Sequence, residues 1–105
     1  MVRIHWTERA VKNLKHIYDY IAVDSKIYAD QFIKRIVRAT EKLERFPLIG
    51  RVVPELVDLG LREVLFQNYR IVYRPNIEEK LVEIIAVVHT SRDLLMLARN
   101  EWELQ

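Results

Sequence analysis

The spacing of apolar residues changes once along the chain, and this change decides the fold class. From position 8 to position 46 apolar residues recur at intervals of three and four, which is the period of an amphipathic helix. From position 61 to position 89 they fall in short runs rich in β-branched and aromatic residues, as in strands. The sequence therefore predicts an α+β fold in which a helical half precedes a sheet-forming half.

Two helices are predicted in the first half. Thr7 is the candidate N-cap of a helix over about 8–23, and Ser25 offers a new N-cap after a short break. The second helix is predicted to end at about Arg45, shortly before a proline. Because the break is so short, we expect an antiparallel helical hairpin over about 8–45.

Strands are predicted on both sides of this hairpin. Alternation predicts a short strand over 2–6, before the first helix. Two β-rich runs, 61–66 and 69–74, are separated only by Gln67 and Asn68, which suits a tight hairpin turn. Together with a third strand they make sheet hairpins over about 61–89 in a mostly antiparallel sheet.

The remaining segments complete a single domain over 1–105. Both glycines and two of the three prolines lie in 47–60, which reads as a loop with room for a short helical turn. The run 81–89 is apolar apart from one glutamate, as in a central strand buried on both faces. Thr90 or Ser91 is expected to cap a last helix over about 91–102. The predicted order is β-α-α-β-β-β-(α), with the helical hairpin packed on one sheet face.

The predicted hairpin turn assigns side chains to the two faces of the sheet. One face carries three cross-strand pairs: Phe66 with Tyr69, Val64 with Ile71, and Arg62 with Tyr73. The other face combines Arg70 and Arg74 with Glu63 and aliphatic residues. We expect this second face to be left open, where its arginines either pair with Glu63 or bind phosphate groups of a target.

Composition excludes several classes of function. There is no cysteine, so disulfides, thiolate nucleophiles and cysteine-based zinc sites are excluded. The three histidines are far apart and there is no glycine-rich phosphate loop, so we expect neither a metal nor a cofactor. No apolar run approaches the ~18 residues that span a bilayer, and the chain starts without a signal-peptide pattern. We therefore expect a cytoplasmic protein without a membrane partner.

The net charge is small, but arginine and lysine are unevenly distributed along the chain. The chain has 17 Lys and Arg against 15 Asp and Glu, a net charge of +2, which is weak for a protein that coats nucleic acid by charge alone. After Phe46, however, there are six arginines and a single lysine, Lys80. Guanidinium groups suit bidentate recognition of phosphate or carboxylate.

A few residues have the side chains needed for acid–base chemistry or base stacking. His89, at the end of the long strand, is either a general acid or base or a capping residue. Glu55 in the central loop is either a general base or merely solvated. Tyr73 alternates with arginines, as in nucleic-acid surfaces, but its predicted face makes it core. His5 and His16 are expected to be structural or solvated.

Five short motifs occur together in this order along the chain: Pro47-Leu-Ile-Gly50-Arg51, Pro54-Glu55-Leu56, Leu61-Arg62-Glu63, Tyr69-Arg70-Ile71-Val72-Tyr73-Arg74 and Val87-Val88-His89-Thr-Ser-Arg92-Asp93. With the predicted strand and helix order, this series resembles the RelE/ParE family of toxins from bacterial type II toxin–antitoxin modules. The resemblance implies the RelE/ParE-like toxin fold. It also implies a cognate antitoxin that wraps and neutralises the toxin and binds operator DNA.

The resemblance leaves two chemistries open. RelE-like members are ribosome-dependent, metal-independent endoribonucleases that cleave mRNA, and the resemblance would then make Arg70, His89 and Glu55 catalytic. ParE-like members instead inhibit DNA gyrase and carry the same motifs. In either case the candidate phosphate- or target-binding residues are Arg51, Arg62, Arg74, Arg92 and Tyr73.

Two features favour the gyrase branch. The predicted helical hairpin is long, and the segments after it lack the lysine cluster that many ribosome-dependent members use to hold RNA. A non-toxic structural or adaptor domain is the third alternative that the sequence leaves open.

Overall fold

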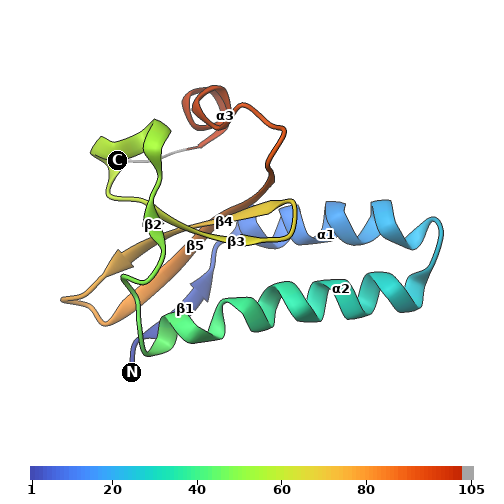
Figure 1. The fold of residues 1–105 in the computed structure, drawn as a ribbon, viewed down its shortest axis with the longest axis horizontal. Helices are drawn as coiled ribbons and strands as arrows, with labels where there is room; N and C mark the ends of the chain where they lie inside the picture. The colour runs from blue at the N-terminus through green and yellow to red at the C-terminus, as the bar shows by residue number, and fades with distance from the viewer. Residues whose placement is uncertain (103–105) are drawn as a thin grey trace.

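The computed structural model describes residues 1–102, and the last three residues of the predicted domain lie outside the described part. Five strands form one sheet, with helices on both of its faces (Figure 1). The elements in chain order are β1 (Arg3–Trp6), α1 (Glu8–Ala22), α2 (Lys26–Ala39), the 3-10 helix η1 (Glu41–Glu44), β2 (Arg51–Val52), the 3-10 helix η2 (Pro54–Leu59), β3 (Arg62–Phe66), β4 (Tyr69–Asn76), β5 (Leu81–His89) and α3 (Leu94–Glu101). None of the helices in residues 1–102 is long and apolar enough to cross a membrane.

The predicted helical hairpin is confirmed, together with the two residues expected to start its helices. The Thr7 hydroxyl accepts from the amide of Ala10, and the Ser25 hydroxyl accepts from the amide of Tyr28. Thr7 also donates to the carbonyl of Ile84, at 2.7 Å, which fixes the start of α1 against β5. The hairpin extends past the end of the sheet (Figure 1).

The predicted end of the second helix was wrong. Helix α2 ends at Ala39, and η1 replaces the last turn that the apolar spacing had placed inside it. The Thr40 hydroxyl donates to the carbonyl of Val37 at 2.7 Å, so a local side-chain bond competes with continuation of the helix. The change in winding buries Leu43 completely.

The sheet has the order β1-β5-β4-β3-β2, and it is antiparallel except that β1 runs parallel to β5. The predicted register of the β3–β4 hairpin is confirmed, with Phe66 opposite Tyr69 and Arg62 opposite Tyr73. Gln67 has a φ of +50°, as a tight turn between these strands requires. The prediction of a mostly antiparallel sheet is therefore correct, but the short edge strand β2 was missed inside the expected loop.

The first core lies between the helical hairpin and one face of the sheet. Its centre consists of fully buried aliphatic and aromatic side chains from α2, β4 and β5, including Ile36, Ile71, Tyr73 and Ile84. Burial of the apolar side chains on one face of the two helices stabilises the packing of the helical hairpin against the sheet.

The second face of the sheet is covered as well, which contradicts the expectation of an open face. Helices η2 and α3 pack over it and close a second core that includes Leu56, Val72, Leu94 and Trp102. The helix α3 is capped by the Asp93 side chain, which accepts from the amide of Met96, rather than by Thr90 or Ser91. Covering this face is a matter of burial, since the aliphatic residues of β4 and β5 that point to it would otherwise face water.

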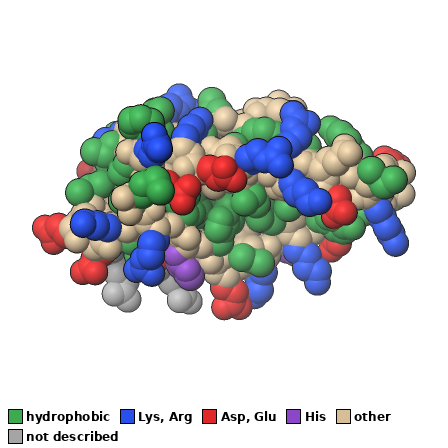
Figure 2. Space-filling model, turned by 90° about the horizontal axis from the view of Figure 1, so that it is seen from below, with side chains coloured by type: hydrophobic (Ala, Val, Ile, Leu, Met, Phe, Trp, Pro, Cys, Tyr) green, Lys and Arg blue, Asp and Glu red, His purple; other side chains and the backbone are tan. Residues whose placement is uncertain are grey.

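Charges of both signs are interspersed on the face seen from below Figure 1, where α2 lies. Figure 2 shows Lys and Arg side chains there separated by Asp, Glu and hydrophobic groups. The drawn residues thus make no continuous basic surface on this face, in keeping with the small net charge of +2.

Candidate functional site

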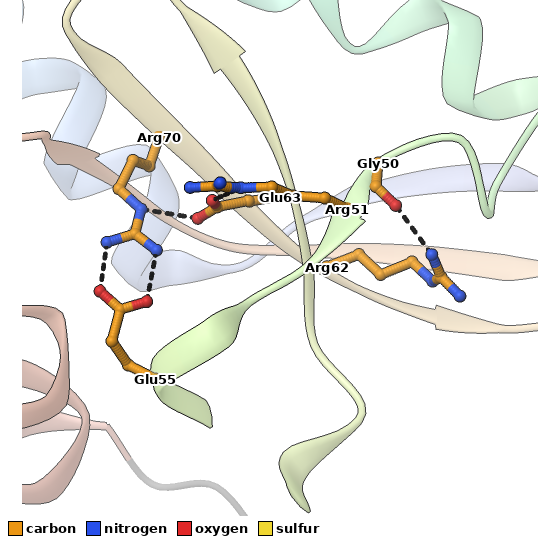
Figure 3. A network of polar contacts seen from close by, with 6 residues as sticks. All are labelled: Gly50, Arg51, Glu55, Arg62, Glu63 and Arg70. Atoms are coloured by element: carbon orange, nitrogen blue, oxygen red, sulfur yellow. Dashed lines mark hydrogen bonds and ion pairs between the residues drawn. The ribbon is translucent and has the colours of Figure 1, made fainter. Parts of the chain in front are cut away.

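Arg70 lies at the centre of an ion-pair network on the second face of the sheet. Its side chain projects from β4 beneath η2 and is only 7% exposed as a residue. The two Nη atoms of Arg70 bond the two carboxylate oxygens of Glu55 at 2.7 and 2.8 Å, a bidentate pair (Figure 3). Its Nε donates to Glu63 at 2.6 Å. All three nitrogen atoms of the guanidinium group are therefore held by carboxylates.

Glu63 is the most deeply buried member of this network. Only 1% of the residue is exposed, and its second oxygen accepts from Arg51 Nε at 2.5 Å. A buried carboxylate is tolerated only when its charge and hydrogen bonds are compensated, and here Arg70 and Arg51 do so from two sides. The network thus alternates in sign from Arg51 to Glu63 to Arg70 to Glu55 (Figure 3).

The network changes the acid–base properties of its members. Hydrogen bonds from Arg70 lower the pKa of Glu55 from 4.5 to about 2. The same bonds, together with those to Glu63, raise the pKa of Arg70 above its usual value. A carboxylate with so low a pKa has little tendency to take a proton, because a general base works best with a pKa near the operating pH. In this arrangement Glu55 is suited to neutralising Arg70.

Two further candidates, Arg62 and Tyr73, anchor the loop before β2. Arg62 Nη1 donates to the carbonyl of Gly50 at 2.8 Å (Figure 3). It also donates to the carbonyl of Leu48 at 3.2 Å. Tyr73 is fully buried, and its hydroxyl accepts from the amide of Gly50 at 2.9 Å. The expectation that Tyr73 contacts a target is therefore not supported, because its side chain has no surface to offer.

His89 lies apart from Glu55 and Arg70. In the β4–β5 register His89 is opposite Tyr69, and Arg70 is opposite the preceding residue, Val88. Since successive side chains of a strand point to opposite faces, His89 lies on the helical-hairpin side and Arg70 on the α3 side. The rings of His89 and Tyr69 meet edge to face at 5.3 Å. The structure therefore brings Glu55 and Arg70 together but separates both from His89.

The surface arginines are spread over the sheet rather than gathered. Arg51 lies at the edge strand β2, where its side chain is 58% exposed while it holds Glu63. Arg74 is partly exposed opposite Glu83, and Arg92 is exposed between β5 and α3. The sequence left open whether Arg70 and Arg74 pair with Glu63 or bind phosphate groups. Arg70 does pair with Glu63, although the pair is buried rather than exposed to solvent.

An exposed apolar surface with an arginine rim was expected as the partner surface, but its place in the fold was not predicted. It is formed by the loop before β2 and by the β4–β5 turn, and we call it the loop surface: Phe46, Pro47, Leu48, Ile49 and Ile77. More than half of the Phe46, Leu48 and Ile49 surfaces is exposed. The signal was present in the apolar run Phe46-Pro-Leu-Ile49, but sequence alone does not say that Arg62 and Tyr73 hold this loop outward.

Comparison with known proteins gives a consistent family. Residues 4–94 match the family model described as the ParE toxin of the type II toxin–antitoxin system parDE. The chain is also similar to the toxin RelE2 of Caulobacter vibrioides, with 33% identity over 93 residues that cover 88% of this chain and 99% of that protein.

Solved structures share the fold. A chain of the chromosomal ParDE toxin–antitoxin system from P. aeruginosa superposes with a TM-score of 0.71 at 23% identity, covering 85% of this chain and 96% of that one. A chain of the RelBE2 toxin–antitoxin complex from Mycobacterium tuberculosis gives a TM-score of 0.64 at 22% identity, covering 84% and 96%. A chain of the E. coli RelBE complex gives 0.57 at 19% identity, covering 88% and 100%.

Proposed function

The chain belongs to the ParE toxin family of type II toxin–antitoxin systems, and from this premise we propose that it inhibits growth by binding DNA gyrase. The observation that carries the proposal is the internal neutralisation of Arg70 by Glu55 and Glu63. An arginine that stabilises a phosphoryl-transfer transition state must offer its donors to the substrate. Here a bond to a carboxylate is made at each of the three guanidinium nitrogens of Arg70 and the residue is only 7% exposed, which favours action through binding over phosphate chemistry.

The loop surface is the proposed contact with a protein target. Its apolar side chains are held outward by the bonds of Gly50 to Tyr73 and Arg62, so little conformational entropy is lost when a partner covers them. Exposed apolar clusters with polar rims are typical of protein-binding sites. Arg51 lies beside this surface at the sheet edge and supplies a charged rim.

A cognate antitoxin is the second proposed partner. The solved relatives come from toxin–antitoxin systems, and we expect this chain to be neutralised in the same manner. The antitoxin would cover the loop surface and thereby compete with the target, and operator DNA would be bound through the antitoxin. Both gyrase and operator DNA place the proposed site of action in the cytoplasm.

Binding of purified gyrase tests the proposed contact. Ile49→Asp is expected to weaken binding at least tenfold, because it places a charge in the apolar centre of the contact. Val23→Asp is the matched control, since Val23 is also apolar and is even more exposed, at 83% against 56% for Ile49, but lies in the turn between α1 and α2. Equal affinities for the two variants would reject the loop surface as the contact.

Induced expression separates the proposal from the two alternatives. The gyrase proposal predicts growth arrest with accumulation of cleaved DNA. Codon-phased mRNA cuts on translating ribosomes, abolished by Arg70→Ala or His89→Gln in a folded protein, would instead identify a RelE-like ribonuclease. Normal growth without antitoxin would favour a structural or adaptor domain.

A further inference from the structure

A polar cleft of about 430 Å³ lies between the start of α1, the end of β5 and α3. We call it the α1–α3 cleft. Its polar lining comes from segments far apart in the chain, and consists of Arg9, Asn13, His16, His89, Arg92 and the carboxylate-bearing Glu101. This cleft is distinct from the loop surface and from the Arg70 network, neither of which contributes a residue to it.

Asn13 offers hydrogen-bond donors to the cleft. Its Oδ1 accepts from the backbone amide of Val87 at 3.0 Å, where β5 extends past the end of β1. Because a backbone N–H can only donate, the oxygen of Asn13 must face Val87. The amide NH₂ group, with two donors, is the part of this side chain left for a ligand.

A backbone amide likewise sets which nitrogen of His89 accepts a hydrogen bond. The backbone amide of Ser91 donates to His89 Nδ1 at 3.1 Å. A neutral imidazole that accepts at Nδ1 carries its proton on Nε2. Contact with the Tyr69 ring fixes the plane of the imidazole, so His89 presents an oriented N–H donor.

Two arginines supply the positive charge. Arg9 Nη2 donates to the backbone carbonyl of Glu101 at 2.5 Å, which links α1 to α3 and leaves further donors on the same guanidinium group. Arg92 is exposed in the turn between β5 and α3 and lines the same cleft. Among the described residues that line the cleft, two arginines stand against one carboxylate-bearing residue, Glu101, so this lining carries a net positive charge.

The donor-rich wall is combined with aromatic and apolar surface. Tyr69 and Trp102 line the same cleft, next to Val87 and Leu97. An anion is satisfied by N–H donors and guanidinium groups, and a nucleobase packs on aromatic rings. The volume lies within the range of small-ligand pockets. From this combination we propose that the α1–α3 cleft binds the phosphate group of a nucleotide, either free or within a single strand of nucleic acid.

Calorimetric titration of the full-length protein tests the proposal, and it does not depend on whether gyrase is the target. The probes are inorganic phosphate, AMP and the pentanucleotide dT5. AMP is expected to bind more tightly than inorganic phosphate, because only AMP reaches the aromatic wall. Tighter binding of dT5 than of AMP would assign the phosphate to a nucleic-acid strand, whereas the reverse order would assign it to a free nucleotide.

Variants show whether AMP binds in the α1–α3 cleft. Arg92→Ala is expected to weaken AMP binding about tenfold, the loss of a charge-assisted hydrogen bond. Arg99→Ala, on the same helix as Glu101 but lining a different surface, is the matched control and should bind as the wild type does. Glu101→Gln should tighten binding, because it removes the opposing charge.

Nuclear magnetic resonance gives a readout at the site. AMP is expected to shift the side-chain amide signals of Asn13 and the indole signal of Trp102. Three results would overturn the proposal: no detectable binding of any probe, equal losses in Arg92→Ala and Arg99→Ala, or tighter binding of a pentaglutamate peptide than of AMP.

Discussion

Arg70→Met is expected to destabilise the protein strongly, even though arginine is a polar residue. Methionine has a similar length but no charge, so the variant leaves the Glu63 carboxylate in place with only 1% of the residue exposed. Glu63 then keeps a single partner, Arg51, whose side chain is 58% exposed. Breaking a buried ion pair on one side costs about 3–5 kcal/mol, and the remaining bond to Arg51 places the expected loss near the lower end, at about 3 kcal/mol.

Replacing Glu63, the other partner of this buried ion pair, should cost less stability. In Glu63→Leu, Arg70 keeps its bidentate pair with Glu55, and Arg51 turns to solvent, so we expect a loss of about 1.5 kcal/mol. In the double variant both buried charges are gone and two apolar side chains replace them. Such replacements are often neutral, so the double variant should come within about 1 kcal/mol of the wild type.

Urea unfolding with linear extrapolation measures these differences. For a domain of this size a loss of about 3 kcal/mol also lowers Tm by at least about 12 °C. A loss below about 1 kcal/mol in Arg70→Met would refute the reasoning, because it would mean that Glu63 is solvated or neutral in the folded protein. A double variant no more stable than Arg70→Met would refute it as well.

Three further predictions concern residues around this network. The pKa of Glu55 in the folded protein, about 2, lies below the ordinary value of 4.5. The contribution of the ionised Glu55 to stability is therefore complete above about pH 4.5 and is lost as the pH falls toward 2. Over that interval Glu55→Gln should lose less unfolding free energy than the wild type. Gly50→Ala should cost about 1–3 kcal/mol, since an added Cβ would lie 2.5 Å from the Glu63 carbonyl oxygen and 2.7 Å from the Tyr73 hydroxyl. Tyr73→Phe should cost about 1–3 kcal/mol, because the Gly50 amide loses its buried acceptor. Urea unfolding at pH 7 measures the last two, and a change below about 0.5 kcal/mol would contradict either.

The elements fixed by local sequence were predictable. Thr7 and Ser25 cap the helices as expected. Such a cap depends only on a hydroxyl that accepts from an amide three residues later, so it can be recognised from local sequence. The two-residue turn at Gln67 set the register of the β3–β4 hairpin for the same reason. The end of α2 was missed because Thr40 bonds the helix backbone, an effect that apolar spacing does not register.

The features that depend on tertiary placement were not predictable. The apolar run 81–89 indicated burial on both faces of one strand, but not that α3 and η2 would cover the second sheet face, because nothing local says where a short helix packs. It placed Arg70 and Glu63 on one face but not Glu55 beside them, since Glu55 arrives through η2. Similarly, Arg9 and Asn13 join His89 in one cleft only because α1 packs along β5.

We propose that the protein acts by binding gyrase and that the Arg70 network is structural. Supercoiling by purified gyrase, titrated with the wild type and with the Arg70→Met/Glu63→Leu double variant, tests this claim most directly. Both proteins are expected to inhibit supercoiling with similar potency, because the double variant keeps the fold and the loop surface. Unaffected supercoiling at high excess of the wild type, or inhibition by the wild type alone when the double variant is folded, would contradict it.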